Sequence, residues 1–213
     1  MIVVTRRTFV AGASVSAAFG LAGCASSTQP TGPDPAFARK EVDFLSKEKP
    51  GTIIVNPAEH FLYSVAEGGR AMRYGVGVGS EGFGWSGVAS VHDKQEWPDW
   101  YPTAETLQRK PEVIKQLKPL QSGLGVPGGP ENPLGARAMY LWQNNKDTLY
   151  RIHGTNEPWT IGRNVSAGCI RMVNEDAIHL YERTPVGTKV VVLQGPIAVP
   201  PSSPLATPGV NVG

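Results

Sequence analysis

The sequence predicts a mainly β domain with one or two short helices. Gly and Pro supply 25 and 19 of the 213 residues, well above average usages of roughly 7% and 5%. Both residue types favour turns and extended segments, which makes a helical bundle improbable. Apolar and polar residues also alternate with period two in the first half of the chain, which is the pattern of a half-buried strand.

The expected strands follow one another along the middle of the chain. Residues 52–56 form a β-branched run that ends at Asn-Pro, and residues 60–65 follow after a short turn, so the pair predicts a β-hairpin. After the turn at 67–69, the alternation over 72–78 predicts a third antiparallel strand. Three more strands are expected at 138–142, 148–153 and 189–193.

Two helices are expected, one of them inside an irregular region. Residues 80–135 are rich in Gly, Pro and Trp and lack sustained periodicity, apart from a helical pattern around 105–117 that Pro111 interrupts. Long irregular segments in compact domains are usually functional. We expect the second helix to begin with Asn174 as its N-cap, since acidic residues follow in the first turn, and to end at 185–187.

The charge balance excludes one class of partner. The formal net charge is +2, and both excess positive charges are Arg6 and Arg7. From Cys24 onward there are 18 basic and 18 acidic residues. A nucleic-acid-binding function is therefore not expected, because it needs a basic patch.

Residues 1–24 have the features of an export signal with a lipid-attachment site. A paired arginine precedes a weakly apolar, uncharged run over 9–21, which is too short for a membrane span and fits a signal peptide. Residues 5–10 resemble the twin-arginine export signal. Leu-Ala-Gly-Cys at 21–24 resembles the lipobox of bacterial lipoproteins, in which Cys24 would receive diacylglycerol. The alternative is an ordinary signal peptide with a Cys at its cleavage site.

These features predict a location and a division of the chain. We expect a periplasmic protein anchored through Cys24, and the absence of Asp directly after Cys24 favours the outer membrane. Residues 25–36, which are small, polar and Pro-rich, are expected to form a flexible tether. Residues 195–213 contain five Pro, three Gly and no charge, which predicts a disordered tail. The body, residues 37–194, has the size of one domain.

His153 and Cys169 are the candidate catalytic pair. A thiolate nucleophile needs a base within hydrogen-bond reach, and these two residues are 16 positions apart, with glycines between them. Gly168 would allow a close backbone approach, and consecutive N–H groups there could receive an oxyanion. The alternative is a buried structural Cys together with a satisfied core His. On the residues alone, both alternatives stay open.

Several further motifs accompany this pair along the chain. They are Ile-Ile-Val-Asn at 53–56, Phe-Leu-Tyr at 61–63, Gly-Val-Gly-Val-Gly at 75–79, Glu-Trp-Pro-Asp-Trp at 96–100, Pro-Gly-Gly-Pro at 127–130, Asn-Pro-Leu-Gly at 132–135, His-Gly-Thr-Asn at 153–156, Ile-Gly at 161–162 and Ser-Ala-Gly-Cys-Ile-Arg-Met at 166–172. In this order they resemble the catalytic domain of the bacterial L,D-transpeptidases (YkuD-like) over about residues 50–194. The resemblance implies the β-sandwich or barrel-like fold of that family.

The resemblance also implies roles for individual residues. Cys169 matches the nucleophile and His153 the base that deprotonates it, oriented by the backbone carbonyl of Gly154. The positions that shape the nucleophile turn, the oxyanion site and the acyl-donor contacts are Ser166, Gly168 and Arg171, and a pocket-lining tyrosine matches Tyr140. The chain departs from the family pattern at Ala167, where many members have His, and at residues 85–89, where members commonly have a Thr-Pro-x-Gly turn.

The implied reaction is acyl transfer on peptidoglycan stem peptides. Cys169 would attack the L-centre carbonyl of meso-diaminopimelate, release D-alanine and pass the acyl group to an amine. That amine belongs to another stem, which gives a crosslink, or to an outer-membrane protein, which becomes tethered. No cofactor or metal is expected, because the other histidines lie on separate elements without ligand spacing.

Other hypotheses use the same residues. A non-catalytic wall-binding lipoprotein would keep the fold as a scaffold, and a thiol hydrolase would use water as the acceptor. His179 could replace His153 as the base, although the sequence places it on the outward side of the second helix.

Overall fold

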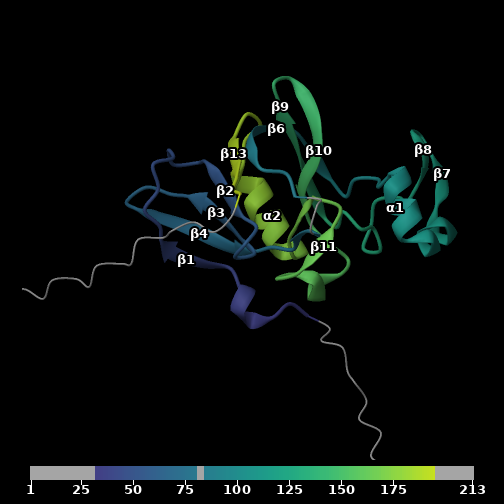
Figure 1. Ribbon diagram of the computed structural model, residues 1–213, viewed down its shortest axis with the longest axis horizontal. Coiled ribbons are helices and arrows are strands. Elements are labelled where there is room, and N and C mark those ends of the chain that lie inside the picture. The colour runs from purple at the N-terminus through teal and green to yellow at the C-terminus, as the bar shows by residue number, and fades with distance from the viewer. Residues whose placement is uncertain (1–31, 81–83, 195–213) are drawn as a thin grey trace, which may run out of the picture.

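The computed structural model describes residues 32–80 and 84–194. Nine strands form one sheet in the order β1-β4-β3-β2-β13-β6-β9-β10-β12, and two small sheets pair β5 with β11 and β7 with β8 (Figure 1). The predicted signal peptide, residues 25–31 of the predicted tether and the predicted tail lie outside the described residues. None of the described helices is long and apolar enough to cross a membrane.

The elements have the following bounds. The strands of the large sheet are β1 Lys40–Asp43, β2 Ile53–Asn56, β3 Phe61–Val65, β4 Arg70–Gly75, β6 Gly87–Glu96, β9 Arg137–Gln143, β10 Lys146–His153, β12 Ile170–Arg171 and β13 Lys189–Val192. The small sheets contain β5 Val78–Gly79, β7 Lys118–Leu120, β8 Gly123–Gly125 and β11 Asn164–Ser166. The helices are α1 Ala104–Arg109 and α2 Asn174–Arg183, and 3₁₀ turns occur at η1 Pro35–Phe37, η2 Pro111–Gln116 and η3 Pro158–Thr160.

The predicted N-terminal hairpin is confirmed, whereas the predicted strand over 72–78 divides in two. β2 and β3 pair antiparallel, and β4 adds to β3 in the same way. β4 ends at Gly75, however, and β5 belongs to a different sheet. β4 ends here because the backbone groups that follow it bond to distant residues and not to β3. The Val76 carbonyl accepts from the Gly162 N–H, and the Gly77 N–H donates to the Arg171 carbonyl.

The prediction of an irregular region over 80–135 was wrong for its first part. Residues 87–96 form β6, which lies inside the large sheet between β13 and β9. A register shift between Val91 and Asp93 interrupts the alternation, since a bulge inserts one residue into the strand and reverses the faces beyond it. The helical pattern with a break at Pro111 is confirmed by α1 and η2.

The second predicted helix is confirmed as α2, but its predicted cap is not. Val173 is the N-cap, and no side chain caps this end. Asn174 is instead the first helical residue, and its amide oxygen accepts hydrogen bonds from two distant backbone groups, those of Ala136 and Thr155. The Asn174 side-chain oxygen, which the sequence pattern assigned to capping the helix, therefore binds backbone N–H groups far away in the sequence.

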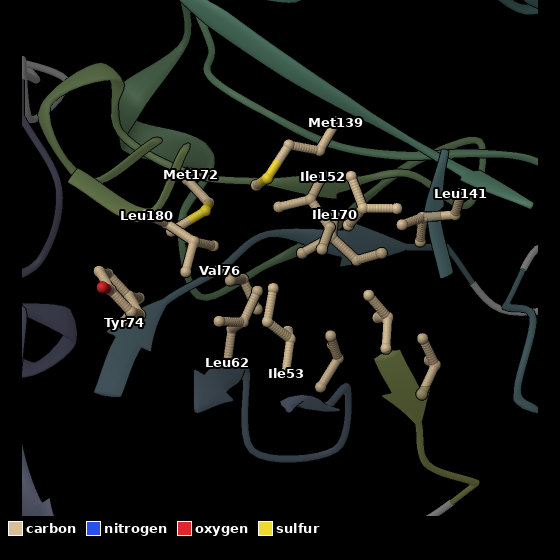
Figure 2. Packing of buried hydrophobic residues seen from close by; sticks show 14 of the residues in the cluster. Ile53, Leu62, Tyr74, Val76, Met139, Leu141, Ile152, Ile170, Met172 and Leu180 are labelled. Carbon is tan, nitrogen blue, oxygen red and sulfur yellow. The ribbon is translucent and has the colours of Figure 1, made fainter. Parts of the chain in front are cut away.

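The main core is an apolar cluster between the two halves of the sheet and α2, and a second, smaller cluster around Phe44 and Tyr63 lies elsewhere on the sheet. Ile53 and Leu62 from β2 and β3 lie opposite Met139 and Ile152 from β9 and β10, and α2 contributes Leu180 (Figure 2). Each fully buried side chain of this kind contributes roughly 1.5–3 kcal/mol. The predicted mainly β fold class is thus confirmed, because one curled sheet encloses its own core.

Candidate active site

The core residues of β10 and β12 determine which side chains face outward at the site. The two strands are parallel, with Ile152 beside Ile170 and His153 beside Arg171. Both isoleucines are buried in the core (Figure 2). Because side chains alternate along a strand, Arg151 and His153 point to the other face. Cys169 directly precedes β12. If the register of the two strands is continued by one residue, Cys169 lies beside Arg151 on that same face.

His153 is buried and has a defined tautomer. Its Nδ1 lies 2.5 Å from the carbonyl oxygen of Gly154. A carbonyl oxygen can only accept, so Nδ1 carries the proton and Nε2 is the basic nitrogen. Burial, followed by the positive charge of Arg171, lowers the pKa of His153 from 6.5 to about 3. The imidazole is therefore neutral at neutral pH, as a general base must be.

The carbonyl of Gly154 is held in place from behind. The Gly154 N–H donates to the carbonyl of Arg137 at 2.9 Å. The Asn174 Oδ1 accepts from the N–H groups of Ala136 at 2.9 Å and Thr155 at 3.2 Å. A Cβ on Gly154 would overlap that amide oxygen, so this position needs glycine for space.

Ser166 and Gly168 shape the turn that presents Cys169. The Ser166 hydroxyl donates to the carbonyl of Cys169 at 2.6 Å and accepts from the Gly168 N–H at 3.1 Å. Gly168 adopts a φ of 118°, which an L-residue with a side chain rarely adopts. Since the Gly168 N–H is already engaged by Ser166, it is not available to an oxyanion in this arrangement.

The thiol of Cys169 is half-buried and directed at a backbone carbonyl. Its Sγ lies 3.9 Å from the carbonyl oxygen of Leu149. Leu149 has a φ of 64° and lies in the register shift of β10 between Asp147 and Arg151. Burial raises the pKa of the Cys169 thiol, and the backbone N–H and guanidinium of Arg151 oppose that rise.

The described contacts of Cys169 and His153 include no hydrogen bond between the two side chains. Both pKa shifts disfavour the charged forms, so the resting pair is a neutral thiol and a neutral imidazole. Catalytic hydrogen bonds are often long in an unliganded enzyme and tighten with substrate. The arrangement is compatible with a thiol that must turn before it transfers its proton.

Arg171 and Tyr140, two further predicted site residues, also lie on this outward face. Arg171 forms an ion pair with Glu157 at 2.8 Å, and its side chain is 13% exposed. The Tyr140 hydroxyl donates to the Gln95 Oε1 at 3.1 Å. Burial raises the pKa of Tyr140. Tyr140 is the register partner of Arg151, and the Arg151 guanidinium lies against its ring.

The other histidines lie elsewhere. His60 bonds Asn164, His179 bonds the Tyr74 hydroxyl, and His92 stacks on the Trp142 ring. Among the residues that the structure describes, no three His, Cys, Asp or Glu side chains gather where they could hold a metal ion.

The fold and the site together define a mainly β domain that carries a cysteine and a neutral histidine on one face of its sheet. The sequence profile of the YkuD family, the L,D-transpeptidase catalytic domain, matches residues 50–192. The chain belongs to this family.

Individual relatives agree with the profile. A probable L,D-transpeptidase ErfK/SrfK of Salmonella typhimurium is 39% identical over 150 residues, which cover 68% of this chain and 45% of that one. A putative L,D-transpeptidase of Fuscovulum blasticum is 36% identical over 152 residues, 70% of this chain and 72% of that one. The chain thus spans less than half the length of the first of these relatives.

One solved structure has a different description. It is a probable carnitine operon oxidoreductase of Brucella melitensis, 50% identical over 75% of this chain and 96% of that one, with a TM-score of 0.49. At that score the likeness carries no argument about this protein.

The sequence patterns gave no role in the site to three residues that contribute to it. They are Arg151, its partner Asp147 and the amide of Asn174. Arg151 could have been found, because it lies two residues before His153 on a predicted strand and so shares its face. The role of Asn174 depends on loops brought together only by the fold, and no local pattern indicates it.

Proposed function

We propose that this protein is a peptidoglycan L,D-transpeptidase that uses Cys169 as its nucleophile and His153 as its general base. The observation that carries the proposal is the neutral, buried imidazole of His153, whose Nδ1 is fixed by Gly154, on the same face as the thiol in a domain of this family. The fixed tautomer leaves Nε2 as the only nitrogen that can accept the thiol proton.

The first half-reaction forms a thioester. The Cys169 thiol turns from the Leu149 carbonyl toward the imidazole, and its proton passes to Nε2. The sulfur then bonds to the L-centre carbonyl carbon of meso-diaminopimelate. As the C–N bond to D-alanine breaks, the imidazolium returns the proton to the departing amine.

The developing oxyanion needs a donor. The Gly168 N–H is engaged by Ser166, so we assign this role to the N–H of Cys169 itself, which is the next amide of the turn. Ser166 keeps that turn in place through the Cys169 carbonyl. A single oxyanion donor is typically worth a factor of about 10² to 10³ in kcat.

In the second half-reaction an amine attacks the thioester. The attacking amine gives its proton to Nε2 of His153, the C–S bond breaks, and the imidazolium returns that proton to the departing thiolate. If the amine is the D-centre amine of a second stem, the product is a crosslink between two diaminopimelates. If it belongs to an outer-membrane protein, the product is a tethered protein, and if water attacks instead, the outcome is hydrolysis.

Acylation by a carbapenem tests the nucleophile. The wild-type protein should gain the mass of one carbapenem, and Cys169→Ala should gain none while keeping its circular dichroism spectrum and melting temperature. His153→Gln should form the same adduct far more slowly. An adduct on Cys169→Ala would exclude this thiol as the nucleophile.

The acceptor is tested on the cell wall. Mass spectrometry of wall digests from cells with wild-type protein and with Cys169→Ala should differ in diaminopimelate crosslinks or in wall-bound peptides. An unchanged muropeptide profile would instead support a non-catalytic wall-binding lipoprotein.

Location is a separate proposal. We infer from the sequence of residues 1–24 that the protein is exported to the periplasm and anchored to a membrane through a lipid on Cys24. Cys24→Ala should move the protein from the membrane fraction to the soluble periplasmic fraction. Wild-type protein that is already soluble after cell disruption would contradict the anchor.

A further inference from the structure

We propose that Arg151 is a specificity residue that binds a carboxylate of the acyl donor beside the scissile bond. The inference rests on the proposed function, because it assumes that an acidic stem peptide occupies the face that carries Cys169. It concerns a residue that the motif-based assignments leave without a role.

The backbone places Arg151 next to the nucleophile. Ile152 is beside Ile170 in the parallel pair of β10 and β12, so the preceding residues, Arg151 and Cys169, come level and share the outward face. The thiol itself points at Leu149, two residues before Arg151 on the same strand.

The guanidinium of Arg151 is fixed before any substrate arrives. Its Nη1 and Nη2 donate to Asp147 Oδ1 and Oδ2 at 3.2 and 2.9 Å. The guanidinium carbon also lies 4.7 Å from the centre of the Tyr140 ring. An ion pair on one edge and an aromatic ring against one face restrict the rotamers, so little entropy remains to be lost on binding.

The guanidinium still has capacity for a ligand. Among the residues that the structure describes, Asp147 takes two of the five N–H donors of Arg151, which leaves three for a ligand. The side chain is 17% exposed, so it reaches the surface while much of it is shielded from water. A charge-assisted bond is stronger in such surroundings than on an open surface.

The acyl donor carries matching groups close to the bond that breaks. The released D-alanine ends in a carboxylate, and the D-centre of diaminopimelate carries another. Arg171, the second guanidinium beside the catalytic pair, holds Glu157 through Nη1, and its Nε is buried without a hydrogen-bond partner. Arg151 lies beside Cys169 in the register of β10 and β12, and Arg171 lies two residues beyond Cys169 on β12. The acyl donor offers two carboxylates to these guanidiniums, and we assign one of them to Arg151.

Amidated substrates test this assignment and identify the carboxylate. Three tetrapeptide stems are compared: the free acid, a stem amidated at the diaminopimelate D-centre, and a stem ending in D-alaninamide. For one amidated stem, wild-type kcat/KM should fall about 10- to 100-fold, as expected for a lost hydrogen bond to a charged group. In Arg151→Met the same acid-to-amide ratio should lie near 1.

The acid-to-amide ratio of kcat/KM separates an effect on carboxylate binding from an effect on the reactivity of the thiol. Removing Arg151 also removes a positive charge that opposes the rise of the Cys169 pKa, and this change slows both substrates alike. A matched control is Arg70→Met. Arg70 on β4 forms an ion pair with Glu41 on β1, with 2.6 Å between the Arg70 Nε and the Glu41 Oε1, and these strands lie at the other end of the sheet. The Arg70→Met variant should keep the wild-type ratio. Wild-type ratios for both amides in Arg151→Met would overturn the proposal.

Two further measurements keep the outcome decisive. If Arg151→Met does not fold, Arg151→Lys replaces it, because lysine keeps the positive charge but lacks the planar guanidinium that binds a carboxylate through two N–H groups. Its acid-to-amide ratio of kcat/KM should fall between 1 and the wild-type value. An unchanged ratio would overturn the proposal. If the wild type does not turn over any stem, calorimetric binding to Cys169→Ala gives the same comparison. Binding that depends on Arg151 without turnover would contradict the transpeptidase alone, and no binding would overturn both proposals.

Discussion

The electrostatics of His153 and Cys169 keep both of these side chains uncharged in the unliganded protein. Burial lowers the pKa of the imidazole and raises the pKa of the thiol, and a preformed thiolate–imidazolium pair would have to overcome both effects. In the proposed mechanism, the proton therefore moves from the thiol to the imidazole during the reaction rather than before it. This distinguishes the site from one with a permanently ionised cysteine, in which the thiol pKa is lowered.

The low pKa of His153 predicts how stability depends on pH. The unfolded chain takes up a proton on this residue near pH 6.5, whereas the folded state does not until about pH 3. The contribution is intact above pH 6.5 and is lost as pH falls from 6.5 toward 3. At pH 4.5 this amounts to about 3 kcal/mol, on the basis of 1.36 kcal/mol for each pH unit below 6.5.

Urea unfolding between pH 8 and pH 4.5 measures the effect. His153→Gln should lose less free energy of unfolding than the wild type over this range. The matched control is His92→Gln, which removes an exposed imidazole stacked on Trp142 and should follow the wild-type curve. Parallel curves for wild type and His153→Gln would show that His153 becomes protonated in the folded state at ordinary pH.

At the scale of elements, α2 supports the backbone around His153, the proposed base, although it carries none of the proposed catalytic residues. Its first residue, Asn174, binds the backbone on both sides of the site: Ala136 before β9 and Thr155 after Gly154. The helix itself packs against the core through Ala177 and Leu180. A shift of α2 would therefore move the Gly154 carbonyl and, with it, the imidazole.

Replacing Asn174 by Ala should destabilise the protein and impair the base. Two backbone N–H groups would lose their shared acceptor, and we expect a loss of about 1–3 kcal/mol in the free energy of unfolding. Activity should fall mainly in kcat, because the imidazole loses its alignment while the substrate contacts remain. Asn174→Asp, which keeps an acceptor oxygen, should recover much of the lost activity.

The matched control is Asn164→Ala. It removes a single exposed bond to His60 and should change stability by less than about 0.5 kcal/mol. Equal effects of the two variants on kcat would show that Asn174 has no special connection to His153.

The sequence predicted those elements whose patterns are local and uninterrupted. The hairpin of β2 and β3, the strands β9, β10 and β13, and the helix α2 all show a clear period or a clear turn signal. β6 was missed because its bulge reverses the alternation in the middle of the strand. The division of β4 from β5 was missed because Gly77 bonds to Arg171, nearly a hundred residues later.

For the molecule as a whole, the candidate catalytic residues were predictable because they lie in two short, contiguous motifs. Parallel pairing of β10 with β12 then brings the motifs together. The residues around them were harder to predict. Asp147 and Arg151 lie at the two ends of the register shift in β10, and Asn174 binds the backbone of two other segments of the chain. The residues that support the site come from the topology of the sheet, whereas the residues proposed to carry the chemistry come from local sequence.

The same topology leaves one segment outside the core, and this predicts an uneven distribution of stability. α1, η2, β7 and β8 project from the sheet beside β6 and β10 (Figure 1). β7 and β8 pair only with each other, and Trp100 joins Val126 by a pair of backbone hydrogen bonds at the base of this segment. Ile114 and Leu124 are exposed by 57% and 61%, so this segment buries little apolar surface of its own.

Native-state hydrogen exchange should resolve this difference. Amides of β7 and β8 should exchange at least about 100-fold faster than those of β9, because opening this hairpin disrupts none of the main core. The control is β5 with β11, which is also a two-stranded sheet, but Val78 of β5 belongs to the core cluster. Its amides should be protected nearly as well as those of β9. Slow exchange in β7 and β8 would mean that the segment opens only when the whole domain unfolds. Fast exchange in both small sheets would mean that the number of strands, rather than attachment to the core, determines local stability.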